Sequence, residues 1–152
     1  KGVSLNIMMQ WSYGNKIMNE LRRTRNAMRT TSNLGQDALA RWKAQGDITN
    51  FPMIRYQDKM ENFRPSSFNM EDGSFLRIKE ITLSYNIPPK WCKKVFLKSA
   101  NVYISGTNLL TWSKYSGYDP GGNTSTSPFI QGVDNGAFPK SRSYNLGVNF
   151  TF

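Results

Sequence analysis

The chain has 152 residues, the size of one domain, and its 20 Lys and Arg against 10 Asp and Glu give a formal net charge of +10. It lacks histidine and has one cysteine, Cys92. This composition excludes an imidazole general base, a His-based triad, an internal disulfide and a multi-cysteine metal cluster. The carboxylates are scattered, with no pair placed for acid/base catalysis, so we expect no enzyme activity and no cofactor.

No segment approaches the roughly 18 continuous apolar residues of a membrane-spanning helix, so any membrane-spanning part must consist of β-strands. The first predicted strand covers residues 3–13, in which every odd position through Trp11 is apolar. Most of the even positions are polar. This period of two is typical of a strand with one apolar face.

A long polar connection, residues 14–74, follows. Helical spacing predicts short helices within residues 16–30, from Ile17, Leu21 and Met28, and within residues 36–45. The arginine-rich stretch of residues 22–29 fits a solvated loop, and it also fits a contact with lipid phosphates.

The second predicted strand covers residues 75–87, although Arg77 and Lys79 break the alternation of its first half. A short turn, residues 88–99, contains Cys92 among lysines. The cysteine fits a small residue at a turn better than an activated thiol.

The third predicted strand covers residues 100–112, where Gly106 and Asn108 blur the alternation. A loop rich in Gly, Pro, Asn and Ser spans residues 113–142. The fourth strand, residues 143–152, alternates to its last residue. Its apolar positions are Tyr144, Leu146, Val148, Phe150 and Phe152.

Two environments explain the alternation. In a soluble all-β module, which would bind carbohydrate or, given the charge, nucleic acid, the aliphatic side chains pack inward. In a transmembrane barrel they face lipid, and the small polar residues line a wet interior. The long, short, long order of connections and the aromatics that flank the strands favour the barrel, without a nucleic-acid partner.

Three segments carry a resemblance to a known family. They are DGSFLRIKEITLSYNIPPKW (72–91), NVYISGTNLLTWSKYSGYDP (101–120) and FPKSRSYNLGVNFTF (138–152). In wording, order and spacing they resemble the last strands of the SusC/RagA-like TonB-dependent outer-membrane transporters. The resemblance implies an all-β fold: the C-terminal strands of an antiparallel barrel of about 22 strands, whose plug domain is absent from this chain.

The resemblance also implies a function. Such transporters import glycans or peptides, receive energy from the TonB complex through the missing N-terminal part, and work with a SusD-like surface lipoprotein. The implied location is the outer membrane of a Gram-negative bacterium, with the long loops extracellular and the C-terminus periplasmic. The terminal strand resembles the signal that the barrel-assembly machinery reads.

Candidate substrate contacts lie at the root of the last long loop: Trp112, Tyr115, Tyr118 and Asp119. Aromatic faces stack on sugars, and carboxylates accept hydrogen bonds from hydroxyl groups. The same segment, YSGYDP, also fits a turn that folds the loop, with Asp119 placed before Pro120.

Overall fold

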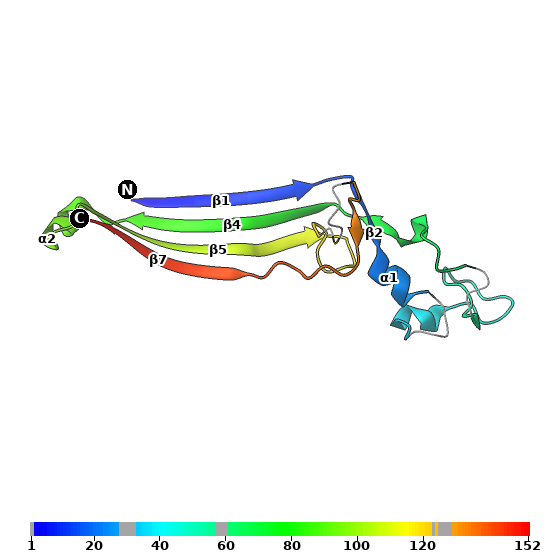
Figure 1. Cartoon of the computed structure of the whole chain (residues 1–152). Coiled ribbons are helices and arrows are strands. Elements are labelled where there is room, and N and C mark those ends of the chain that lie inside the picture. The colour runs from blue at the N-terminus through cyan, green and yellow to red at the C-terminus, as the bar shows by residue number, and fades with distance from the viewer. Residues whose placement is uncertain (1, 28–32, 57–60, 123, 125–128) are drawn as a thin grey trace. The chain divides into compact units, whose positions relative to one another are not determined.

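The computed structural model describes residues 2–27, 33–56, 61–122, 124 and 129–152. These residues form two compact units. The sheet unit holds the four long strands, which lie side by side in Figure 1, and the loop unit holds the two long connections.

The sheet unit is an antiparallel sheet with the strand order β1-β4-β5-β7. Its strands are β1 (Val3–Ser12), β4 (Phe75–Asn86), β5 (Ser99–Ser113) and β7 (Ser143–Thr151). Each end lies within one residue of the range that the alternation predicted. The period of two therefore located the strands as well as their type.

Residues opposite one another in a ladder share a face, and the rows across the sheet alternate in chemistry; Met8, Tyr103 and Phe75 are the large apolar or aromatic members of otherwise polar rows. One row is aliphatic: Leu5, Leu83, Ile104 and Leu146. The next row is polar: Asn6, Thr82, Ser105 and Asn145. The sheet thus has an apolar face and a polar face. On the apolar face Leu5 is 61% exposed and Leu146 is 77% exposed, so the chain does not bury these side chains in a core.

A β-bulge explains why the first half of β4 breaks the sequence pattern. Met8 pairs with Glu80 and Met9 pairs with Ile78, which leaves Lys79 as an extra residue. The extra residue shifts the alternation by one position and moves Arg77 to the polar face. Arg77 and Lys79 therefore break the alternation in the sequence because of this bulge, and the first half of β4 keeps its apolar face. The Arg77 side chain is buried, and its Nε donates to Thr111 Oγ1 at 3.0 Å.

The connection between β4 and β5 folds as one short helix, α2 (Pro89–Lys94), at the end of the sheet where β7 also ends (Figure 1). Pro89 suits the first turn of a helix because its fixed φ is helical and it needs no amide partner. Cys92 is buried, and its Sγ donates to the carbonyl oxygen of Ile87 at 3.6 Å. The structure thus uses Cys92 as a small buried residue beneath a turn.

The loop unit contains a small three-stranded sheet with the order β3-β2-β6. Its strands are β2 (Lys16–Asn19), β3 (Met70–Asp72) and β6 (Val133–Asp134), which come from both long connections. The short helices are α1 (Glu20–Arg25), η1 (Gln36–Ala40) and η3 (Ser67–Asn69). Among the residues that the structure describes, no helix is both long and apolar enough to cross a membrane.

The two predicted helices are found in part. Ile17 belongs to strand β2 and not to a helix, because its backbone pairs with Glu71 and its side chain is among the most buried of the chain. The helix begins only at Glu20, after the side chain of Asn19 caps it by accepting from the amide of Arg22. Met28 lies outside the described residues. The second predicted helix is the 3₁₀ helix η1, which ends before Trp42.

Candidate functional site

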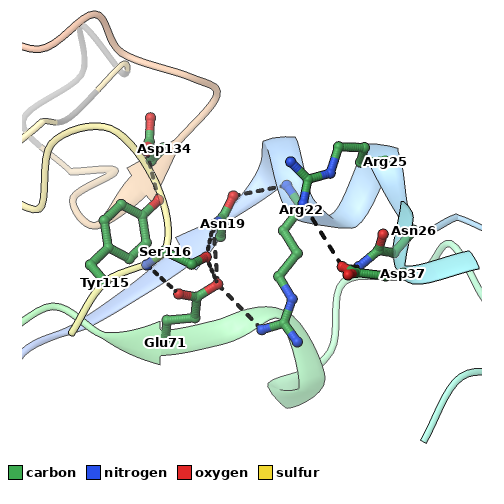
Figure 2. Close-up of polar contacts among 9 residues, drawn as sticks. All are labelled: Asn19, Arg22, Arg25, Asn26, Asp37, Glu71, Tyr115, Ser116 and Asp134. Atoms are coloured by element: carbon green, nitrogen blue, oxygen red, sulfur yellow. Dashed lines mark hydrogen bonds and ion pairs between the residues drawn. The ribbon is translucent and has the colours of Figure 1, made fainter. Parts of the chain in front are cut away.

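A network of polar side chains joins the parts of the loop unit, with the carboxylate of Glu71 at its centre (Figure 2). One oxygen accepts from Ser116 Oγ at 2.8 Å, Asn19 Nδ2 at 3.1 Å and Arg22 Nη1 at 3.3 Å. The other oxygen accepts from the amide of Ser116 at 2.9 Å. A single carboxylate therefore ties together β3, the start of α1 and the loop after β5.

The environment of Glu71 changes its pKa. Burial alone would raise the pKa of this carboxyl group, because it disfavours the charged form. The hydrogen bonds from Ser116, Asn19 and Arg22 favour the charged form and outweigh burial, so the pKa lies below its ordinary value of 4.5. The Glu71 carboxyl group is therefore ionised at neutral pH and carries no proton that it could donate.

Tyr115 and Asp134 form a second buried contact in the same unit (Figure 2). The Tyr115 hydroxyl donates to Asp134 Oδ2 at 2.6 Å, while Asp134 Oδ1 accepts from the amides of Gly136 and Ala137. Burial, followed by the negative charge and hydrogen bond of Asp134, raises the pKa of Tyr115 far above its ordinary value. The ring lies over Gly117, where a Cβ would come within 2.4 Å of Tyr115 Cε1. Tyr115 is therefore part of the loop's internal structure.

Asp119 also serves the loop's own fold. Its side chain is buried, and its Oδ1 accepts from the amide of Gly121 at 2.8 Å. Its carbonyl oxygen accepts from the amide of Gly122 at 3.0 Å, which closes the turn around Pro120. The neighbouring Tyr118 is 64% exposed, so its ring is available to a ligand.

The remaining predicted residues belong to the sheet unit. Trp112 lies in one row with Trp11 and Leu76, on the apolar face, and it is 50% exposed. The terminal-strand residues Tyr144, Leu146, Val148 and Phe150 all lie on β7, and their side chains are exposed, as is that of Phe152. The four predicted substrate contacts therefore do not form one cluster. Two of them fold the loop, one is free in the loop unit and one lies on the apolar face of the sheet.

Sequence reasoning missed a polar hollow of about 240 Å³ in the loop unit. Its polar lining residues are Arg23, Asn26, Asn50, Glu61, Asn62, Arg64, Ser66 and Asn69. Asn26 is only 7% exposed, and its Oδ1 has no hydrogen-bond partner among the described residues, although its Nδ2 donates to Asp37 at 2.9 Å. The sequence signal is weak, because asparagine is ordinary loop composition.

The acidic side chains of these sites take part in the loop unit's own fold. Within the described ranges, no three His, Cys, Asp or Glu side chains are grouped so that they would hold a metal ion. The carboxylates of Glu71 and Asp134 are both engaged in hydrogen bonds that hold the loop.

Curated proteins give clear sequence matches, although no family profile matches the chain. The chain is 30% identical to TonB-dependent receptor P26 of Formosa agariphila over the whole chain, and this match covers 16% of that receptor. It is also 30% identical to TonB-dependent receptor P3 of the same organism, of which it covers 15%. The chain therefore spans about one sixth of the length of these relatives.

Solved structures agree with the sequence matches. The whole chain superposes on the RagAB peptide importer in a "closed-closed" state with a TM-score of 0.78 at 26% identity, covering 16% of that chain. A second RagAB peptide transporter structure gives a TM-score of 0.77 at 26% identity.

The two-faced sheet and these matches define the class of protein: a region of a TonB-dependent outer-membrane transporter. Within that class, the likeness to RagA, which is SusC-like, places the chain in the SusC/RagA-like family. The resemblance seen in the sequence is thereby confirmed, and these relatives are named as receptors and as a peptide importer.

Proposed function

We propose that the chain forms the C-terminal wall of a transporter barrel, with the apolar face of the sheet on lipid and the polar face on a water-filled interior. The separation of chemistry by rows carries this proposal, because it persists from β1 to β7. Aliphatic rows such as Leu5, Leu83, Ile104 and Leu146 alternate with rows of Asn, Ser and Thr. The strands have 9 to 15 residues, and a tilted strand of about 9–11 residues crosses a bilayer.

Energetics support this orientation. Burying a leucine or isoleucine side chain away from water is worth about 1.5–3 kcal/mol, so leaving many of them in water is costly. Lipid removes this cost without a second protein layer. A polar face with asparagine amides and hydroxyls needs the opposite environment, as in Asn101 Nδ2, which donates to Asn86 Oδ1 at 2.7 Å.

The lengths of the connections indicate which end of the proposed barrel wall faces the periplasm. Barrels of this kind have short periplasmic turns and long extracellular loops. We therefore place α2 and the end of β7 on the periplasmic side, and we place the loop unit outside the cell. Trp11 and Trp112 share a row of the apolar face, so we assign Trp112 to the aromatic girdle at the outer interface instead of to a substrate contact.

In the whole transporter we propose import of glycans or peptides, driven by the TonB complex and assisted by a SusD-like lipoprotein. The solved relatives are named as a peptide importer, which favours peptides. The polar hollow beside Asn26 and the exposed ring of Tyr118 are the substrate contacts that the loop unit offers, since Tyr115 and Asp119 are used internally.

The last strand has a further role in the proposal. β7 pairs with β5 on one edge, and no described strand pairs with its other edge. A free edge is a template for another strand. We propose that this edge closes on the first strand of the barrel, and that the residues from Tyr144 to Phe152 are read during insertion.

Spin labels on two neighbouring residues test the orientation. In the full-length transporter, without other cysteines and reconstituted in lipid, Leu146→Cys and Asn145→Cys place labels on opposite faces of β7. We expect oxygen dissolved in the bilayer to enhance the relaxation of the spin label at 146, and a water-soluble nickel chelate to enhance the relaxation of the label at 145. The reverse pattern, or equal relaxation of both labels, would overturn the proposal.

A soluble carbohydrate- or nucleic-acid-binding module is the alternative that the sequence left open. It requires Leu5 and Leu146 to pack against a second layer, whereas both are mostly exposed.

Uptake measurements test whether the transported substrate is a peptide or a glycan. Cells in which the gene is deleted and then restored are compared for import of labelled peptides and labelled oligosaccharides.

A further inference from the structure

An apolar groove of about 410 Å³ lies at the α2 end of the sheet unit. Its floor includes Ala100 and Phe150, which pair with each other in the ladder, and α2 together with the turn that follows it forms its wall. The wall residues are Trp91, Cys92, Lys94, Val95 and Leu97. The Ala100–Phe150 pair lies two residues along from the pair Val102–Val148, on the same face of the sheet. The groove is therefore continuous with the apolar face.

The turn presents large apolar side chains to the outside instead of folding them inward. Trp91 is 70% exposed, Val95 is 60% exposed and Phe96 is 93% exposed. Phe96 has a φ of 59°, a left-handed conformation that non-glycine residues seldom adopt. An exposed apolar cluster of this kind marks a contact with a partner or a membrane.

The charge around the groove indicates the headgroup of the occupant. Residues 88–98 contain four lysines and no acidic residue. All four are exposed: Lys90, Lys93, Lys94 and Lys98. Lys94 itself lines the groove. Ammonium groups beside an apolar slot match a molecule that joins a negatively charged headgroup to a hydrocarbon chain.

We propose that α2 and the groove form a binding site for an anionic phospholipid of the leaflet on the α2 side. One acyl chain lies in the groove between Trp91 and Phe150, and the phosphate is bound by Lys94 and Lys98. Trp91 and Phe96 lie at the level of the headgroups, where aromatic residues are enriched. This site rests on the proposed function, because it needs the apolar face to be embedded in lipid.

Phospholipid binding to the full-length transporter in detergent tests the site by native mass spectrometry. The probes are dimyristoyl phosphatidylglycerol, which is anionic, and dimyristoyl phosphatidylethanolamine, which carries no net charge. We expect the double variant Lys94→Gln, Lys98→Gln to bind phosphatidylglycerol roughly 30-fold more weakly. Each lysine near an anionic headgroup strengthens binding roughly fivefold, and the variant loses two of them. The matched control is Lys114→Gln, Lys140→Gln, which removes one exposed lysine just after the end of β5 and one shortly before the start of β7, away from α2, and this variant should bind as the unaltered protein does.

Two results would overturn the lipid site. The first is equal affinity for phosphatidylglycerol in the double variant and the unaltered protein. The second is competition by glycerophosphoglycerol, which has the headgroup without the acyl chains, at the same concentration as the lipid. The spin-label experiment separates these failures from failure of the proposed function. If oxygen relaxes the spin label at 146 and the double variant still binds phosphatidylglycerol as the unaltered protein does, only the lipid site is refuted.

Discussion

The sheet unit and the loop unit are stabilised by different interactions, although they belong to one chain. In the sheet unit the backbone ladder joins the four strands, and the large side chains of one face are left exposed. In the loop unit the strands have only two to four residues, and buried polar side chains join segments far apart in the sequence. The contact between Asn19 and Ser116, for example, joins residues 97 positions apart.

This difference shows where each unit is vulnerable. A ladder tolerates many side chains provided that each face keeps the chemistry of its surroundings. A polar network fails when one partner is removed, because the groups that remain are buried without a hydrogen bond. Substitutions in the sheet unit should therefore act through the environment, and substitutions in the loop unit should act through specific partners.

The largest effect is expected at the end of the sheet unit. Phe152→Ser in the full-length transporter should remove most of the folded protein from the outer membrane, because it takes an aromatic residue from the strand that we propose the assembly machinery reads. Surface labelling of intact cells measures the level. Lys140→Ser, an exposed position before the same strand, is the control. Normal surface levels of the Phe152 variant would refute the insertion role.

The two faces of the sheet should respond differently to the same charge. Leu146→Arg should destabilise the folded barrel by about 2–4 kcal/mol, the cost of arginine on a lipid face near the middle of the bilayer. Asn145→Arg, one residue away on the polar face, should cost much less. Urea titration of the reconstituted protein compares the two. Equal costs would remove the distinction between the faces.

In the loop unit, Tyr115→Phe should lower the local free energy of opening by about 1–3 kcal/mol, since it leaves Asp134 Oδ2 buried without the hydroxyl donor. Hydrogen exchange of the Gly136 and Ala137 amides, which donate to Asp134 Oδ1, reports the change. Tyr118→Phe alters an exposed ring and should leave this exchange unchanged. Similar exchange in both variants would mean that the buried contact does not hold the loop.

The smallest effect concerns pH. The pKa of Glu71 is lower in the folded loop than its ordinary value of 4.5, so folding favours the ionised form. Its contribution to stability is therefore complete above that ordinary value, and it is lost as the pH falls through the lowered pKa of the folded state. Between pH 7 and pH 5 the protease sensitivity of the loop should stay constant, and it should rise at lower pH. Glu71→Gln should reduce the rise in protease sensitivity at low pH. If the variant shows the same pH dependence as the unaltered protein, the ionised Glu71 carboxylate does not hold the loop together.

The sequence allowed the sheet unit to be predicted well, and the loop unit poorly, for a physical reason. A strand with one apolar face repeats its chemistry every second residue, so Val3, Leu5 and Ile7 indicate both the strand and its face. The transporter function was predicted from the family resemblance, and not from this periodicity. A polar network has no period. Glu71 finds Asn19 and Ser116 only after distant segments have folded together, so nothing local in the sequence marks it.

The candidate site shows the same limit. Tyr115 and Asp119 were singled out for chemistry that suits sugars, but their side chains are used by Asp134 and by the turn at Gly121. The turn that the segment YSGYDP also predicted is present in the structure. Residue type therefore indicated the region, while the partners of each side chain decided which groups are free.

The extra residue at Lys79 has a consequence for changes of chain length. Deleting it would remove the bulge and leave a regular ladder, in which Glu80 stays opposite Met8, Ile78 stays opposite Met9, and residues 75–78 keep their present faces. Deleting a regularly paired residue of β7, such as Asn145, would instead turn the residues on one side of the deletion over to the other face. A one-codon deletion at Lys79 should thus be less harmful than one at Asn145, and we expect natural length variation at this bulge and in the two long connections.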